Sequence, residues 1–440
     1  MTEGTSSILD LAIDGESISA VGPPGSLGSA KEAIDASGLL VLPGMVDAHF
    51  HCRAPSHPER GTFGSESRAA AAGGVTTILE MPVSDPACST PEVLLARRSL
   101  GEAECFVDFG LFSGAALGTV ERAEAMADAG AIGFKMFTHN PPVGREREFD
   151  GLWASSDGDI YEALSLVAPT GLTCTVHAEN QSLIDLFDRR STGEESAQRP
   201  PVIESASIAL LGALSVATGA KVHIAHMSSA ASVEALAAAQ ANGHLISGET
   251  TPHYLVFNDA DIEEFGSFVR VAPPLRTKAD NEQLWEAVAS GLIGVVASDH
   301  APFTPAEKAV PYDAAPRGIP GIELMLPVML DAAARGVLPV ETAVRSMAEA
   351  PARLFGLFPE KGALAVGSDA DVVLWDPKAT SLIEVNSLVS RCAKSAIAYD
   401  GKSYAGKIAA TILRGRAVFK DGSIVGESRG RFVRPIRQAD

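Results

Sequence analysis

The run Leu42-Pro43-Gly44-Met45-Val46-Asp47-Ala48-His49-Phe50-His51 is apolar for most of its length and ends in two histidines that are one residue apart. Side chains alternate between the two faces of a strand, so His49 and His51 are predicted to point the same way. Two imidazoles on one side of a strand end form a platform for a divalent metal. The pattern favours a hydrolase over a binding module, provided that other segments supply the remaining ligands.

The composition is that of a globular protein, with 46% hydrophobic and 20% charged residues in a chain of 440. This length suits one large domain and a smaller one. The net charge of −20 argues against nucleic acid or an anionic membrane as a partner, because both require a basic surface. Scattered cysteines and the lack of a signal-peptide pattern or an apolar membrane span predict a cytoplasmic protein without disulfides.

Short apolar runs alternate along the chain with Ala-rich segments of helical spacing, which predicts a (β/α)8 barrel. The runs show little alternation of polarity, as expected for strands that are buried on both faces. The predicted strands are Leu39–His49, Val75–Met81, Cys105–Phe112, Ala131–Phe137, Leu172–His177, Lys221–His226, His244–Glu249 and Leu292–Ser298.

Both ends of the chain are β-like and contain Gly and Pro turn signals. We therefore predict a small β domain that both termini build together, from residues 1–42 and 365–440. The barrel is predicted to occupy residues 43–364.

Metal-capable side chains, and one lysine in an otherwise apolar run, fall at or near the carboxyl ends of the predicted strands. Barrel active sites form at that face. These residues are His49, His51, Lys135, His177, His226 and Asp299. They exceed the ligands of one tetrahedral zinc with an open position, but they fit two metals that share a bridging group. An ammonium cannot ligate a cation and is costly to bury, so we expect Lys135 to be modified to a carbamate that bridges the metals.

Other candidates are less specific. His253 follows the seventh predicted strand, and a place in the pocket wall competes with a packing role. His223 is predicted by alternation to face away from the site and to pack. The segment Gly318-Ile319-Pro320-Gly321 is most simply a turn, although Pro320 and Gly321 could offer backbone groups to a ligand.

Several segments together resemble the amidohydrolase superfamily and, within it, the cyclic amidohydrolases: hydantoinase, allantoinase, dihydropyrimidinase and dihydroorotase. Besides the histidine pair, they are Ala70-Ala71-Ala72-Gly73-Gly74-Val75-Thr76-Thr77, Gly133-Phe134-Lys135, Val176-His177-Ala178-Glu179-Asn180, Ser298-Asp299-His300, Pro351-Ala352-Arg353-Leu354-Phe355-Gly356 and Gly367-Ser368-Asp369-Ala370-Asp371. The resemblance covers nearly the whole chain.

The resemblance implies a binuclear centre, with zinc as the expected metal and manganese or cobalt as alternatives. One metal would lie on His49, His51 and Asp299, the second on His177 and His226, and carboxylated Lys135 between them. A hydroxide between the metals would attack the ring carbonyl, and Asp299 would carry its proton to the leaving nitrogen. The product would be an open-chain N-carbamoyl or ureido compound. Relatives also suggest a homotetramer.

The substrate branch depends on the residues around the centre. The chain resembles dihydroorotases in having an arginine at position 53. However, Val83, Ala272 and Phe303 stand where that branch has polar residues that bind dihydroorotate. The segment Ile78-Leu79-Glu80-Met81-Pro82 is more similar to hydantoinases and allantoinases, which we therefore favour. Arg53 and Phe303 are expected at the substrate, with a structural ion pair as the alternative role of Arg53. The rival functions are hydrolysis of a carboxylate-bearing ring and an inactive scaffold, which the complete ligand set disfavours.

Overall fold

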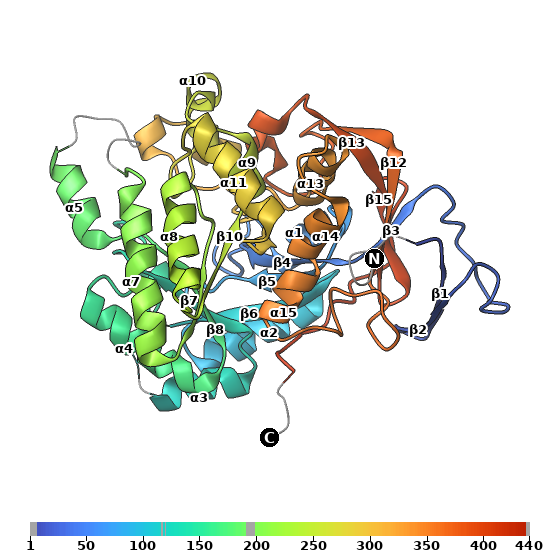
Figure 1. Cartoon of the computed structure of the whole chain (residues 1–440), viewed down its shortest axis with the longest axis horizontal. Helices are drawn as coiled ribbons and strands as arrows, with labels where there is room; N and C mark the ends of the chain where they lie inside the picture. The colour runs from blue at the N-terminus through green and yellow to red at the C-terminus, as the bar shows by residue number, and fades with distance from the viewer. Residues whose placement is uncertain (1–6, 116–117, 119, 191–198, 437–440) are drawn as a thin grey trace.

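The computed structural model describes residues 7–115, 118, 120–190 and 199–436, and its largest element is a parallel eight-stranded barrel (Figure 1). The strands follow one another around the barrel in chain order, and almost all of their residues are buried. They are β4 (Met45–Phe50), β5 (Val75–Glu80), β6 (Asp108–Gly114), β7 (Gly133–Phe137), β8 (Thr173–His177), β9 (Lys221–Ile224), β10 (Ile246–Thr250) and β11 (Val295–Val296). The predicted barrel is confirmed.

Helices surround the barrel and follow its strands along the chain (Figure 1). Many begin at a Ser or Thr whose hydroxyl accepts a free amide of the first turn, as at Thr62, Ser156 and Thr277. The longer helices are α1 (Phe63–Ala72), α2 (Pro91–Glu104), α3 (Val120–Ala129), α4 (Asp157–Val167), α5 (Gln181–Arg190), α7 (Val202–Thr218), α8 (Ala230–Ala241), α11 (Lys278–Ser290), α13 (Met325–Ala334), α14 (Val340–Met347) and α15 (Glu349–Leu354). Shorter ones are α9 (Pro252–Val256), α10 (Asp261–Phe265) and α12 (Pro305–Lys308). In the described part of the chain, no helix is long and apolar enough to cross a membrane.

The barrel closes between the last and the first strand through the residues that follow β11. His300 forms a parallel bridge with Phe50, and the His51 amide donates to the His300 carbonyl at 2.8 Å. Ser298 donates through its amide and its hydroxyl to the buried carboxylate of Asp47. Closure therefore brings the histidine pair and the segment around residue 299 to the same end of the barrel.

A separate antiparallel sheet lies beside the barrel and combines strands from both ends of the chain (Figure 1). Its strand order is β15 (Ser423–Ile424), β14 (Arg416–Lys420), β13 (Ser403–Leu413), β12 (Val372–Leu382) and β3 (Leu40–Pro43). The strands β1 (Asp10–Asp14) and β2 (Ser17–Gly22) form a hairpin of their own. The expected β domain is thus present. Its bounds at residues 1–42 and 365–440 remain a prediction, and residues 1–6 and 437–440 lie outside the described part.

The expectation of one continuous strand over Leu39–His49 is wrong, because the chain changes sheets at Gly44. Residues 40–43 pair with β12, whereas residues 45–50 pair with β5. The Gly44 amide donates to the Asp371 carbonyl, and a side chain at this position would meet the side chain of Thr76. Only glycine fits where the two sheets approach so closely.

Two C-terminal segments pack against opposite ends of the barrel. The connection between β12 and β13 (residues 383–402) reaches the loops at the carboxyl end, where the Ser395 hydroxyl donates to the Phe303 carbonyl at 2.6 Å. The Ser390 hydroxyl donates to Glu66 of α1 at 2.6 Å. At the other end, the tail joins the edge of β6 through the Phe109 amide, which donates to the Arg431 carbonyl.

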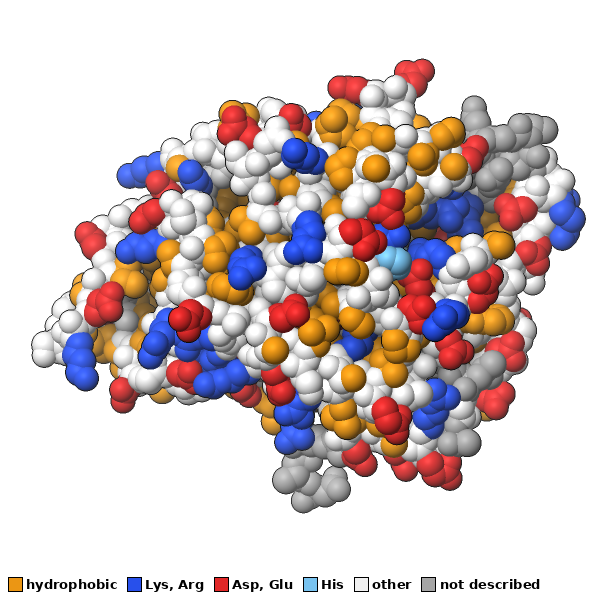
Figure 2. Space-filling model, turned by 180° about the vertical axis from the view of Figure 1, so that it is seen from behind, with side chains coloured by type: hydrophobic (Ala, Val, Ile, Leu, Met, Phe, Trp, Pro, Cys, Tyr) orange, Lys and Arg blue, Asp and Glu red, His pale blue; other side chains and the backbone are white. Residues whose placement is uncertain are grey.

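A buried charge network lies at the amino end of the barrel strands. The Lys361 ammonium contacts Asp108, Asp369 and Asp371 at 2.5, 2.7 and 2.9 Å, and Arg414 contacts Asp108 as well. These carboxylates already have cationic partners, so they form an ion-pair network rather than a vacant cation site. The outer surface is a mixture of acidic, basic and hydrophobic side chains, as the face in Figure 2 illustrates.

Candidate metal centre

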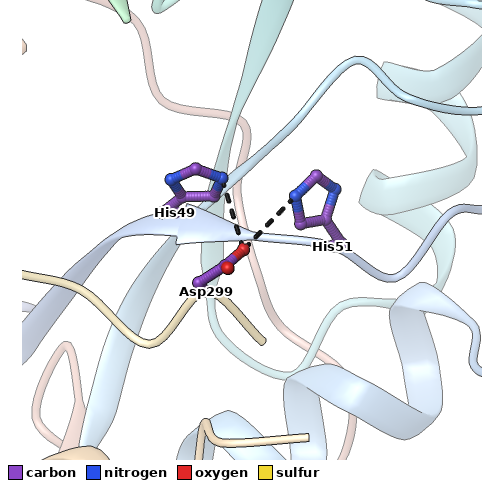
Figure 3. Close-up of side chains that lie close together, drawn as sticks. All are labelled: His49, His51 and Asp299. Atoms are coloured by element: carbon purple, nitrogen blue, oxygen red, sulfur yellow. Dashed lines mark ion pairs between the residues drawn. The ribbon is translucent and has the colours of Figure 1, made fainter. Parts of the chain in front are cut away.

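The first group of candidate ligands comes from both sides of the barrel closure. His49 lies in β4, His51 follows it directly, and Asp299 follows β11. The Oδ1 atom of Asp299 lies 3.4 Å from His49 Nε2 and 3.7 Å from His51 Nε2 (Figure 3). Both rings therefore point at the same carboxylate, as strand alternation predicts. All three side chains are largely buried, and burial raises the pKa of Asp299 above its usual range.

Asp299 and His226 share an unusual backbone conformation. Their φ angles are +41° and +35°, in the left-handed region that residues other than glycine rarely adopt. Such strain persists only where the surrounding structure holds it, and it is concentrated at functional sites. Here it turns each side chain inward just after its strand ends.

A second group consists of His177, the last residue of β8, and His226, which follows β9. His177 Nδ1 and His226 Nε2 face each other at 3.0 Å, and both rings are buried. Burial lowers the pKa of both imidazoles, which favours the neutral form that ligates metals. The His226 ring also lies 5.2 Å from the His49 ring, so the two groups are adjacent.

Lys135 lies in the middle of β7 and is completely buried. Its Nζ atom has no hydrogen-bond partner among the described residues. Burial lowers the pKa of its amine, because a charged ammonium is poorly solvated there. The charges of Glu249 and Asp299 oppose this shift. A buried amine without a partner suits conversion to a carbamate, whose oxygens would find cations beside it.

His49 is oriented by a buried chain of polar residues that the sequence did not reveal. Its Nδ1 atom lies 2.5 Å from Glu249 Oε1, which leaves Nε2 to face Asp299. Glu249 Oε2 in turn lies 3.2 Å from His223 Nε2, and His223 Nδ1 lies 2.8 Å from the Ser247 hydroxyl. A packing role away from the site, as predicted for His223, is therefore incomplete, because its ring binds the carboxylate that contacts His49. Carboxylates placed in this way fix the tautomer and raise the basicity of a metal-ligating histidine.

A similar arrangement orients His177. Its Nε2 atom lies 2.8 Å from Glu179 Oε2, which Arg199 also contacts at 2.6 Å. This contact directs the Nδ1 atom of His177 toward His226. His139 lies against the His177 ring, with 4.7 Å between the ring centroids. The carboxylates of Glu179 and Glu249 both lie at or just after the end of an apolar strand, but no sequence pattern indicates which histidine each one contacts.

Glu249→Gln is expected to weaken metal retention by about 10- to 100-fold, because the carboxylate behind His49 loses its charge. Metal content after dialysis against graded chelator measures the effect. Glu323→Gln is the matched control, since Glu323 accepts hydrogen bonds from the Val389 and Ser390 amides and from no ligand. Equal metal retention in the two variants would contradict the role of Glu249.

The residues predicted to contact the substrate differ in their hydrogen-bond partners. Arg53 is buried, and its guanidinium lies 4.9 Å from the centre of the Phe303 ring. His253 lies in α9 with its Nε2 atom buried and without a partner in the described structure. Pro320 is buried, and the Gly321 amide donates to the His300 ring at 3.1 Å, so that amide is already used. The substrate roles of these residues remain predictions.

Taken together, the fold and the site define a barrel with candidate metal ligands at the carboxyl ends of its strands. The Amidohydrolase family model matches residues 40–418. An allantoinase of Rubrobacter xylanophilus is 38% identical over 100% of this chain and 96% of its own length. A dihydroorotase of Halobacterium salinarum is 35% identical over 97% of both chains. The solved L-hydantoinase (dihydropyrimidinase) from Arthrobacter aurescens has a TM-score of 0.90 at 32% identity and covers 96% of this chain and 95% of its own.

The chain belongs to the amidohydrolase family, which generally binds divalent metals. The predicted resemblance and the predicted hydrolase activity are confirmed.

Proposed function

We propose that the protein opens a cyclic amide or ureide of the allantoin and hydantoin type by hydrolysing a ring C–N bond. The similarity to allantoinases and hydantoinases over nearly the whole chain supports this substrate class. The observation that carries the proposal is Lys135, a fully buried amine without a partner in the described structure, beside four histidines and Asp299. No purely structural role accounts for that combination.

The residues fit a two-metal centre in the arrangement expected from the sequence. His49, His51 and Asp299 would hold one cation, His177 and His226 the other, and carboxylated Lys135 would contact both. When bound, the cations would lower the pKa of a water molecule and polarise the ring carbonyl. Zinc is the metal that we propose, with manganese or cobalt able to replace it.

Asp299 is the group that we propose for proton transfer. Its carboxylate faces His49 and His51, and burial raises its pKa, which makes the carboxylate a stronger base than an exposed one. It would accept the proton of the attacking water and return it to the ring nitrogen as the C–N bond breaks, so that nitrogen leaves as a neutral amide. The product would be an open-chain N-carbamoyl or ureido compound.

Treatment with a strong chelator is expected to abolish hydrolysis, and addition of Zn²⁺, Mn²⁺ or Co²⁺ is expected to restore it. The assay is ring opening by purified protein on a panel of allantoin, hydantoin, dihydrouracil and dihydroorotate, together with metal analysis. A fully active preparation that contains no metal would refute the proposed centre.

Arg53 favours a second candidate function, the hydrolysis of a ring that carries a carboxylate. Its guanidinium is buried, and two of its nitrogens, Nε and Nη1, have no hydrogen bond among the described residues. Faster turnover of dihydroorotate than of the neutral rings in the panel would select this alternative. The homotetramer and the cytoplasmic location remain predictions, which sedimentation and cell fractionation would test.

A further inference from the structure

Asp299 lies in a segment whose backbone is strained. Its φ angle of +41° falls in the left-handed region, which residues other than glycine rarely adopt. Such a conformation persists only where neighbouring contacts hold it. On the amino side of Asp299, the amide and the hydroxyl of Ser298 donate to the Asp47 carboxylate. On the carboxyl side, the contacts converge on His300.

His300 is fully buried and is held through both its backbone and its ring. Its amide donates to the Ser298 hydroxyl at 2.9 Å, and its carbonyl accepts the His51 amide at 2.8 Å. The ring stacks on Phe50, with 5.2 Å between the ring centroids and 11° between the planes. Because Phe50 and His51 belong to the segment of the histidine pair, His300 ties that segment to Asp299.

The two ring nitrogens of His300 have different partners, and these partners define its tautomer. The Gly321 and Ile322 amides donate to Nδ1 at 3.1 and 3.3 Å. A ring nitrogen that accepts hydrogen bonds carries no hydrogen, so the hydrogen of the neutral imidazole is on Nε2. The Nε2 atom lies 2.9 Å from Glu66 Oε2 and therefore donates to that carboxylate. The orientation of the ring thus depends on Glu66 on one side and on the Gly321 and Ile322 amides on the other.

Glu66 lies in the first turn of α1 and connects this helix, the residue after Asp299 and the segment between β12 and β13. Its carboxylate accepts hydrogen bonds from the His300 ring, from the Ser65 hydroxyl at 2.7 Å, from the Ser390 hydroxyl at 2.6 Å and from the Arg391 amide at 3.2 Å. Both carboxylate oxygens are therefore used, and the His300 ring shares Oε2 with the Ser390 hydroxyl.

The surroundings of Glu66 accommodate a long polar side chain in a fully buried place. A Cβ atom at Gly61 would come within 2.6 Å of Glu66 Cγ, so glycine at that position leaves the room that the side chain needs. A buried carboxylate is costly to desolvate, and an apolar side chain of similar size would fill the same space. Stability alone therefore gives little reason for a carboxylate here, whereas the buried Nε2 hydrogen of His300 needs an acceptor at this point.

We propose that Glu66 is a positioning residue for Asp299 and acts through the His300 ring. By accepting the Nε2 hydrogen, it holds the ring against Phe50, and the ring in turn holds the backbone that directs the Asp299 carboxylate toward the histidine pair. The catalytic part of this inference rests on the proposed function, because it takes Asp299 as the group that carries the proton. Loss of Glu66 should therefore impair the chemical step rather than the binding of the ring.

The test replaces Glu66 by leucine, which has a similar size and no acceptor, in the full-length protein loaded with Zn²⁺. Glu66→Leu is expected to lower kcat by about 10- to 100-fold, the range found when a residue behind a metal ligand is lost. The substrate is the ring of the panel that the wild-type protein opens fastest. KM should stay close to its wild-type value, because Glu66 acts on the position of Asp299 and not on the ring. Metal analysis of the same preparation separates a displaced Asp299 from a lost metal.

Ser390→Ala is the matched control. It removes a hydrogen bond from the same carboxylate oxygen of Glu66 and leaves the hydrogen bond from His300 in place. It should lower the melting temperature and leave kcat unchanged. An equal fall of kcat in Ser390→Ala and Glu66→Leu would overturn the inference, because the His300 contact would then have no effect of its own.

A double-mutant cycle with His300→Asn tests whether Glu66 acts through the ring. Asparagine can offer an oxygen to the Gly321 amide, but its side chain is too short to reach Glu66. In the His300→Asn background, Glu66→Leu should lower kcat no further. Glu66→Asp is the second variant, in case Glu66→Leu does not fold, and its shorter side chain should lower kcat in the same direction. A wild-type kcat in the folded Glu66 variant would overturn the inference, as would an effect that persists without the His300 ring.

A crystal structure of the metal-free Glu66 variant separates this inference from the proposed function, because it requires neither turnover nor metal. We expect Asp299 to leave the left-handed region and its Oδ1 atom to move away from His49 Nε2 and His51 Nε2, which lie at 3.4 and 3.7 Å in the wild-type protein (Figure 3). Failure of the wild-type protein to open any ring of the panel would refute the proposed function alone. An unchanged backbone at Asp299 in the variant would overturn the inference.

Discussion

Lys135→Met is expected to leave a folded protein that no longer retains both metals and has lost most of its activity. The substitution removes the one ligand that the proposed centre shares, and it puts an apolar chain of similar length into a buried position. We expect activity to fall by more than about 100-fold, the upper end of what mutation of residues behind the ligands causes. Metal analysis and ring-opening rates on the same preparation measure the two effects.

The chain supplies a matched control for this experiment in Lys308, another completely buried lysine. Its ammonium donates to the carbonyls of Arg270, Pro316 and Gly318 at 3.0–3.1 Å, so its role is structural. Lys308→Met should lower the melting temperature and leave the metal content unchanged. Full occupancy of both metals in Lys135→Met would contradict the proposed bridge.

Asp299→Asn is expected to reduce kcat by about 10²- to 10⁴-fold, the range that positioned proton transfer contributes. Asparagine keeps an oxygen that can face His49 and His51, but it cannot accept and return a proton. The loss should therefore appear in kcat more than in KM. Steady-state kinetics and metal analysis together distinguish a lost proton carrier from a lost metal.

Asp47→Asn serves as the comparison for Asp299, since Asp47 is a fully buried carboxylate that accepts hydrogen bonds from Ser298 and from the His49 backbone amide, and from no histidine ring. It is expected to destabilise the barrel closure without a comparable fall in kcat. A wild-type kcat in Asp299→Asn would remove Asp299 from the mechanism.

The barrel and the candidate ligands could be predicted from sequence because both follow from local patterns. An apolar run predicts a buried strand, and the carboxyl ends of parallel strands meet at one face of a barrel. Polar residues such as His177 and Asp299 at those ends are therefore brought together whatever the details of the loops. To predict that His49 and His51 point the same way, only the two-residue period of a strand was needed.

The residues behind the ligands could not be predicted because their partners are distant in sequence. Glu249 is 200 residues from His49, and no spacing or periodicity relates them. The same holds for Glu80, whose carboxylate accepts the Cys52 and Arg53 amides from 28 and 27 residues away in the sequence. The division of the first predicted strand at Gly44 could not be predicted for a related reason. Both halves are apolar, and only their pairing with different sheets, β12 for the first half and β5 for the second, separates them.

The connection between β12 and β13 gives the loops of the catalytic face a support that is independent of the barrel. It holds the Phe303 carbonyl through Ser395, and none of the candidate metal ligands lies in it. Sequence change in residues 383–402 can therefore reshape the wall that meets the substrate and leave the hydrolytic chemistry intact. In evolutionary terms, this offers a route to new substrates through a segment that supplies no candidate metal ligand.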